Sequence, residues 1–195
     1  RGWLRLCGVK LEYRGLEHIP ADQPVIFAAK HQSYGDGLCH IARDPGLAYV
    51  IGDHMLRFPL VGLYLQRAGA VVVDNDAGRR ATGALDDGAA QLARDQRSAL
   101  IFPEGGLTPV GGGRRFRKGV HRLAQALNRP VIPVATNLGC FWPEQDKVLH
   151  PGTAVIEFLP AMALEADSRA FMSALQQRVQ DHTRTLEAEA LAKRP

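Results

Sequence analysis

The sequence of 195 residues predicts an α/β fold, in which helices cover a largely buried sheet. Short apolar segments typical of buried strands alternate along the chain with longer segments typical of helices. Hydrophobic residues make up 46% of the chain and charged residues 23%, which is ordinary for a globular protein. No linker, repeat or low-complexity tract is visible, so we expect residues 1–195 to form one domain.

The expected strands are short and apolar. Residues 10–14 alternate in polarity, whereas residues 24–29 form a continuous apolar run that predicts a strand buried in the sheet. The full set of expected strands is 10–14, 24–29, 47–51, 70–73, 99–102, 131–135 and 154–159.

The expected helices follow these strands at 37–43, 53–67, 77–95, 119–128 and 168–191. Pro59 would begin or kink the helix over 53–67, because proline lacks the N–H that a helix interior needs. Asp167 or Ser168 is the expected N-cap of the last helix. Residues 104–118, which include three consecutive glycines, are expected to form a long loop.

The net charge indicates the kind of binding partner, and the cysteine usage indicates the cellular compartment. The net charge of +4 suits an anionic partner, such as a nucleic acid, a phospholipid surface or a phosphorylated small molecule. Cys7, Cys39 and Cys140 are widely spaced and odd in number, which argues against a disulfide framework or a metal site and favours a reducing compartment.

The N-terminal end of the sequence bears on membrane contact. No apolar run approaches the roughly 18–20 residues of a membrane span, and no signal peptide is visible. Because the chain starts at Arg1 and not at Met, we expect an upstream segment to be missing. Trp3 among basic and apolar neighbours resembles the end of an amphipathic segment at a membrane interface. The alternative is an ordinary first turn packed on the domain.

His31 and Asp36 are separated by four residues and follow a predicted buried strand. A histidine can remove the proton of a hydroxyl, and a carboxylate on its other nitrogen selects the tautomer. The two residues therefore form a candidate catalytic pair for acyl transfer onto a hydroxyl. In the alternative, Asp36 caps the following helix and His31 is a polar loop residue. Ser33 in His-Gln-Ser-Tyr-Gly also suggests half of a nucleophile elbow.

Glu104 follows a second predicted strand, within Phe-Pro-Glu-Gly. We expect its carboxylate to be exposed at the sheet edge, where it can bind substrate hydroxyls. Gly105 and Gly106 allow close backbone approach, and their N–H groups can receive a phosphate or a developing oxyanion. The alternative is a plain glycine turn.

A basic segment ends the expected loop. Arg114, Arg115, Arg117 and Lys118 surround one phenylalanine. These side chains can hold the phosphates of a carrier such as coenzyme A, anionic lipid headgroups or nucleic acid. The alternative is a solvated run of charge.

Four blocks in order resemble the glycerolipid acyltransferase family that includes the 1-acyl-glycerol-3-phosphate acyltransferases. The matching segments are His31 to Asp36 (H-x4-D), Gly69 to Asp74 (a glycine before an apolar strand), Phe102 to Gly105 with Phe116 to Gly119 (Phe-Pro-Glu-Gly and Phe-basic-Lys-Gly), and Val131 to Ala135 (an apolar strand with a central proline). The resemblance covers about residues 10–160.

The resemblance implies a mixed, mostly parallel sheet, with His31 as base and Asp36 as its partner. It implies an acyl-CoA or acyl-carrier-protein donor as co-substrate, no further cofactor and no metal, and a membrane-bound lysolipid acceptor, most simply 1-acyl-glycerol-3-phosphate. Phospholipid synthesis at the cytoplasmic face of a bacterial inner membrane follows as the expected role. The protein would be peripheral or anchored by the missing segment, with no nucleic acid as partner.

The sequence departs from the family at two positions that usually carry arginine. Asn75 stands in the second block, and Leu107 stands after the Pro-Glu-Gly turn. Arginine offers bidentate phosphate contacts that neither residue can reproduce. Candidate replacements lie nearby at Arg79, Arg80, Arg114, Arg115 and Lys118.

These departures keep two alternatives open. One is the same chemistry on a lysolipid without glycerol phosphate, such as a lyso-ornithine lipid. The other is a non-catalytic module that binds lipid or nucleic acid.

Overall fold

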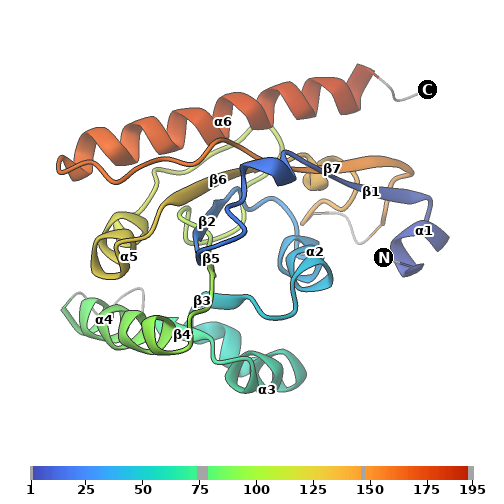
Figure 1. Ribbon diagram of the computed structural model, residues 1–195. Coiled ribbons are helices and arrows are strands. Elements are labelled where there is room, and N and C mark those ends of the chain that lie inside the picture. The colour runs from blue at the N-terminus through green and yellow to red at the C-terminus, as the bar shows by residue number, and fades with distance from the viewer. Residues whose placement is uncertain (1, 74–78, 146–147, 193–195) are drawn as a thin grey trace.

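The computed structural model describes residues 2–73, 79–145 and 148–192. Figure 1 shows one mixed sheet with helices on both faces. The strands are β1 (Val9–Arg14), β2 (Ile26–Ala29), β3 (Ala48–Gly52), β4 (Val71–Val73), β5 (Ala99–Ile101), β6 (Val131–Thr136) and β7 (Gly152–Phe158). The helices are α1 (Gly2–Leu6), α2 (Gly35–Arg43), α3 (Pro59–Arg67), α4 (Arg79–Arg94), α5 (Gly119–Leu127) and α6 (Ser168–Ala192).

The strand order is β1-β7-β6-β2-β5-β3-β4. The pair β6 and β7 is antiparallel, and every other pair in this sheet is parallel. The predicted α/β fold with a mixed, mostly parallel sheet is therefore confirmed. Because β2, β3, β5 and β6 run in one direction, the loops that follow them meet at one rim of the sheet.

The two faces of the sheet pack against different helices because successive side chains of a strand point to opposite sides. Phe27 and Ala29 of β2 join a core cluster with residues of α1, α2 and α3. Ile26 and Ala28 join a second cluster with α4, α5 and α6. Complete burial of a side chain such as Phe27 contributes about 1.5–3 kcal/mol, so each face supplies its own share of the stability.

Most predicted elements are present, with two informative differences. The helix expected over 53–67 divides at Phe58 into a short 3₁₀ helix, η2 (Asp53–Arg57), and α3. Pro59 occupies the first turn of α3, where its missing N–H costs nothing. Helix α2 begins at Gly35, two residues before the expected position, so Asp36 lies in its first turn.

The two ends of the described chain pack on the sheet. Asp167 is the N-cap of α6, and its Oδ1 accepts the N–H groups of Arg169 and Ala170. In α1, Leu4 is buried and the Trp3 ring lies 5.3 Å from that of Trp142, so this segment packs on the domain, while Trp3 and Leu6 remain exposed. None of the described helices is long and apolar enough to cross a membrane.

Candidate active site

The two sequence clusters meet at the predicted rim of the sheet. Strands β2 and β5 are parallel neighbours, with Ala28 beside Ile101. The residues that follow each strand therefore lie together, and the His31 N–H donates to Glu104 Oε2 over 3.1 Å. This hydrogen bond joins the H-x4-D turn directly to the Pro-Glu-Gly turn.

His31 and Asp36 form the predicted pair. The His31 Nδ1 lies 2.9 Å from Asp36 Oδ2. The same oxygen accepts the N–H groups of Gln32 at 2.8 Å and Ser33 at 2.9 Å, as an ionised carboxylate at the start of a helix does. Because this oxygen acts as an acceptor, Nδ1 carries the proton and donates it to Asp36. The lone pair of His31 is then on Nε2, the atom that a general base uses.

Neither alternative interpretation of this turn holds. Tyr34, and not Asp36, is the N-cap residue of α2, and the Asp36 side chain reaches back to the loop before the helix. Ser33 is completely buried and its Oγ accepts the N–H of Gly35, so it is not placed as an exposed nucleophile.

Phe102 positions the imidazole from its other side. The rings of His31 and Phe102 are stacked, with centroids 4.0 Å apart and planes 17° apart. The His31 side chain remains 21% exposed, whereas that of Asp36 is 2% exposed. The ring is thus held by a buried carboxylate and an aromatic face while part of it stays open to substrate. The sequence analysis treats Phe102 only as part of a motif and misses this contact.

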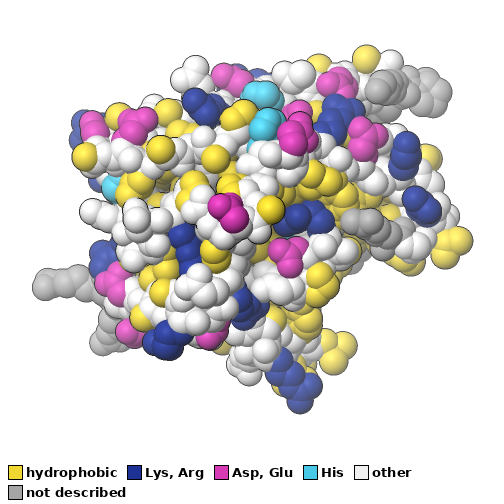
Figure 2. All heavy atoms as spheres, in the orientation of Figure 1, with side chains coloured by type: hydrophobic (Ala, Val, Ile, Leu, Met, Phe, Trp, Pro, Cys, Tyr) yellow, Lys and Arg dark blue, Asp and Glu magenta, His cyan; other side chains and the backbone are white. Residues whose placement is uncertain are grey.

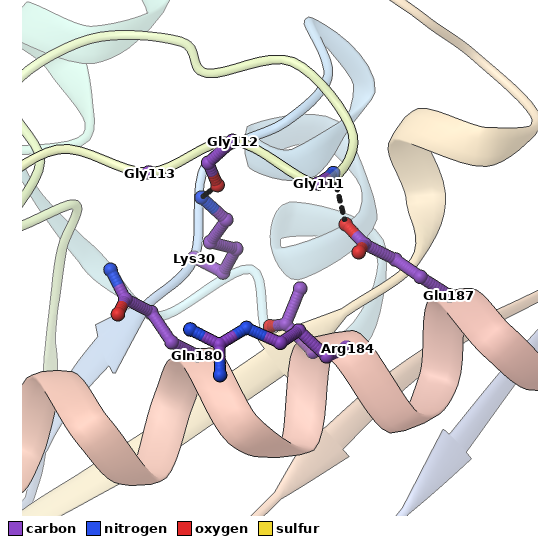
Figure 3. A pocket seen from close by; sticks show the side chains of 8 residues that line it. Lys30, Gly111, Gly112, Gly113, Gln180, Arg184 and Glu187 are labelled. Carbon is purple, nitrogen blue, oxygen red and sulfur yellow. Dashed lines mark hydrogen bonds between the residues drawn. The ribbon is translucent and has the colours of Figure 1, made fainter.

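The expectation that Glu104 is exposed is wrong. Its side chain is buried and forms an ion pair with Lys30, whose Nζ lies 2.7 Å from Glu104 Oε1. Lys30 also donates to Thr108 Oγ1 and to the carbonyl oxygen of Gly112, the second contact being visible in Figure 3. The carboxylate therefore supports the backbone around His31, and it is not free to bind the hydroxyls of an acceptor.

Lys30 is missed by the sequence analysis, because a lysine after an apolar strand is usually exposed. Here its ammonium group reaches the glycine loop that closes over the strand end. Figure 3 shows Lys30 between Gly112 and helix α6, with Glu187 of α6 accepting the N–H of Gly111 nearby. The ion pair with Glu104 is therefore enclosed by the loop and by α6.

Two arginine side chains pack against the glycines of the Pro-Glu-Gly turn. Gly105 has φ +69°, and its N–H donates to the carbonyl oxygen of Phe102, so this N–H is not open to a ligand. A Cβ at Gly105 would lie 2.5 Å from Arg117 Nε, and a Cβ at Gly106 would lie 2.8 Å from Arg114 Nη1. Both guanidinium groups therefore lie against the turn, and the expected role of Arg114 as a replacement phosphate ligand stays a prediction.

The remaining predicted binding residues lie in different places. Arg115 and Lys118 line a groove against α6, together with Arg117. Of Asn75, Arg79 and Arg80, the first lies outside the described residues, and the side chains of the other two do as well. Their expected contact with phosphate stays a prediction.

A second histidine lies one helical turn after Asp36. His40 is buried, and burial is the main cause that lowers its pKa to about 4. Nearby charges have smaller effects: Asp36 raises the pKa, and Arg43 and His31 lower it. The His40 Nδ1 has no hydrogen-bond partner within the described part of the chain. His40 is therefore neutral near pH 7, and only His31 of the two presents a nitrogen to the rim.

Comparisons with known proteins identify the family of the chain. The profile of the family described as Acyltransferase matches residues 10–137. The chain therefore belongs to this acyltransferase family. It is 31% identical over 180 residues to a 1-acyl-sn-glycerol-3-phosphate acyltransferase of Pseudomonas aeruginosa, which covers 91% of this chain and 70% of that protein.

A more distant relative and a solved structure also match the chain. The human 1-acyl-sn-glycerol-3-phosphate acyltransferase alpha is 26% identical over 89% of this chain, and the match spans 62% of the human protein. The crystal structure of the 1-acyl-sn-glycerophosphate acyltransferase PlsC from Thermotoga maritima superposes with a TM-score of 0.80 at 21% identity, covering 95% of this chain and 75% of that one. The structural likeness shows that the two chains share a fold.

Proposed function

We propose that this protein transfers a fatty acyl group from a thioester donor to the free hydroxyl of 1-acyl-glycerol-3-phosphate, forming phosphatidate. The observation that carries the proposal is the Asp36–His31 pair, which leaves Nε2 as a base at an open rim. The names of relatives at 31% and 26% identity support this acceptor.

The geometry supports a direct transfer. The acceptor oxygen attacks the thioester carbonyl carbon while His31 Nε2 takes the hydroxyl proton, and Asp36 stabilises the resulting imidazolium. The tetrahedral intermediate then breaks its C–S bond, the new ester remains, and the imidazolium returns the proton to the departing sulfur. The Gly106 N–H, which no residue of the described ranges accepts, is our candidate donor to the oxyanion.

Arg114 and Arg117 are our candidate ligands for the acceptor's phosphate. Both lie against the Pro-Glu-Gly turn. Neither forms an ion pair with another described residue, so both remain available to an anion. This arrangement compensates for Leu107 at the position where the family usually has arginine, and it favours a phosphate acceptor over a lyso-ornithine lipid.

A panel of acceptors with one labelled acyl-CoA tests the reaction. Lysophosphatidate should be acylated in preference to glycerol 3-phosphate and to a lyso-ornithine lipid. A strong preference for the lyso-ornithine lipid would overturn the proposed acceptor. Thioester hydrolysis without any acylated lipid would leave the non-catalytic binding module as the better account.

We further propose that the rim rests on an anionic membrane surface on the cytoplasmic side, where lysolipid and acyl thioester are both within reach. Large exposed apolar side chains lie on α2, which follows His31, and on α1 and α3, which pack into the same core cluster as α2: Trp3 and Leu6 of α1, Tyr34 and Leu38 at α2, and Phe58, Leu60, Val61, Leu63 and Tyr64 at α3. Figure 2 shows such side chains protruding at the right and lower right, where Figure 1 places α1 and α3. Exposed apolar side chains that cluster in this way are typical of a membrane or protein contact.

Vesicle flotation tests this membrane contact. Leu60 is 84% exposed, and Leu60→Glu should reduce binding to vesicles that contain phosphatidylglycerol by about tenfold, since a carboxylate is costly in an apolar interface. Leu16→Glu is the matched control, because Leu16 is exposed but follows β1, which ends at the opposite rim. Equal binding of both variants would remove α3 from the membrane contact.

A further inference from the structure

A basic groove separates the loop before α5 from the first half of α6. It encloses about 500 Å³ and is lined by Arg115, Phe116, Arg117, Lys118, Arg169, Met172, Ser173 and Gln176. Four of these residues are cationic and none is acidic. A groove of this size is typical of small-molecule sites, and its charge selects for an anion.

The four cations are available to a ligand. None of them forms an ion pair with another residue that the structure describes. Asp167 at the N-cap of α6 is an acidic neighbour: its carboxylate accepts the N–H groups of Arg169 and Ala170, and its charge interacts with Arg169 and Lys118. Four cationic lining residues against this one carboxylate leave the groove with excess positive charge.

The groove is also held in shape before any ligand binds. The Phe116 side chain is buried in the core, and its N–H donates to Gln176 Oε1 over 2.9 Å, which fastens the loop to α6. The Arg117 N–H donates to the carbonyl oxygen of Pro103, which fastens the loop to the Pro-Glu-Gly turn. A pre-organised site of this kind binds its ligand without the entropy cost of ordering a loop.

The groove leads away from the catalytic turn. Gln32, the neighbour of His31, donates to Glu187 of α6. Gln176 and Arg169 precede Glu187 by 11 and 18 residues in the same helix, which corresponds to roughly 16 and 27 Å along its axis. Arg117 lies at the end of the groove next to the Pro-Glu-Gly turn, and Arg169 lies at the other end, which a small ligand at His31 does not reach.

We propose that the far part of this groove binds the phosphate groups of a nucleotide-bearing acyl carrier such as coenzyme A. The inference rests on the proposed acyl transfer and assigns a place to its donor. The acceptor's phosphate is on the carbon next to the reacting hydroxyl, so it stays close to His31. In coenzyme A a long pantetheine arm separates the thioester from the phosphates, as the length of α6 between Glu187 and Arg169 separates the catalytic turn from the far end of the groove.

Titration calorimetry with coenzyme A as the probe tests this assignment without requiring turnover. The double variant Lys118→Ala/Arg169→Ala should bind coenzyme A about tenfold or more weakly than the unaltered protein, because charge-assisted contacts to phosphate are lost. Arg178→Ala is the matched control, an exposed arginine on α6 outside the groove, and should change the affinity less than twofold. Pantetheine, which lacks the phosphates, should bind all three proteins equally.

Three results would overturn the assignment. One is equal affinity of the double variant and the unaltered protein for coenzyme A. Another is an equal loss of pantetheine binding, which would indicate a general disturbance of the fold. The third is a loss of binding to anionic vesicles or to an acidic acyl carrier protein with coenzyme A affinity unchanged. Failure of the acceptor panel would instead refute the proposed reaction, because the titration contains no acceptor.

Discussion

The two turns at the catalytic rim follow adjacent parallel strands, and each carries an acidic residue, yet these residues behave differently. Asp36 supports an imidazole that is partly open to solvent. Glu104 is enclosed together with Lys30, and each of its oxygens accepts hydrogen bonds from the protein itself. The comparison teaches that a carboxylate at a strand end is not thereby a substrate ligand. What it contacts depends on which charges the rest of the chain brings to it.

The largest expected effect comes from the turn that carries His31 and Asp36, here called the reactive turn. His31→Ala should lower kcat/KM for acyl transfer by about 10²–10⁴-fold, because the general base is lost. The circular dichroism spectrum should be unchanged, since the side chain is partly exposed and its removal leaves the backbone contacts in place. His182→Ala, at an exposed histidine of α6, serves as control. Activity within tenfold of the unaltered enzyme would exclude His31 as the base.

The second prediction concerns the Pro-Glu-Gly turn that carries Glu104, here called the supporting turn. Glu104→Gln leaves the buried Lys30 ammonium without its counter-charge and should lower the free energy of unfolding by about 3–5 kcal/mol in urea titrations. Glu189→Gln breaks a partly exposed pair with Arg14 and should cost less than about 1 kcal/mol.

The Glu104→Gln variant also tests whether Glu104 has a structural role or binds the acceptor. If Glu104 binds the acceptor, Glu104→Gln will raise the KM for lysophosphatidate and leave the stability unchanged. A combined Lys30→Met/Glu104→Gln variant separates the two accounts further. Removal of the buried cation should restore part of the lost stability if the ion pair is structural.

The difference between the turns also explains what the sequence can predict. His31 and Asp36 are five residues apart, so their pairing depends on one local turn after a strand that the apolar run over 24–29 predicts. Glu104 and Lys30 are 74 residues apart. Their contact depends on the neighbouring positions of β2 and β5 in the sheet, which no local pattern encodes.

The same reasoning applies to the fold. Alternation of short apolar runs with helical segments predicts the α/β class, and Pro59 predicts a helix start. The strand order and the reversed direction of β7 are properties of contacts between distant segments. The position of Arg117 over Gly105 is likewise a tertiary contact, and the sequence indicates only that a glycine there permits close approach.

A third prediction concerns the buried His40 of α2. The pKa of His40 is about 4 in the folded protein because of burial, against about 6.5 when unfolded. Between these values the unfolded chain binds a proton that the folded chain does not, so stability is full above pH 6.5 and falls as the pH decreases towards 4. The loss from this group amounts to about 3 kcal/mol.

Urea titrations from pH 7 to pH 4 measure this effect. His40→Gln should flatten the decline of the unfolding free energy, whereas His54→Gln, at an exposed position, should leave its slope unchanged. Identical slopes for the unaltered protein and His40→Gln would show that His40 is accessible to protons in the fold.

The smallest expected effects distinguish the two glycines of the supporting turn. Gly105 has φ +69°, a conformation that costs a residue with a Cβ about 1–2 kcal/mol, and the new atom would also displace Arg117. At Gly106 the nearest atom to a new Cβ is Nη1 at the tip of Arg114, which can move away, so Gly106→Ala should change stability by only a few tenths of a kcal/mol. If Arg114 binds the acceptor's phosphate, Gly106→Ala should nevertheless raise the KM for lysophosphatidate. An unchanged KM in this stable variant would show that Arg114 does not bind the acceptor. His31 would then be the reactive group of the rim, and the Pro-Glu-Gly turn would only support it.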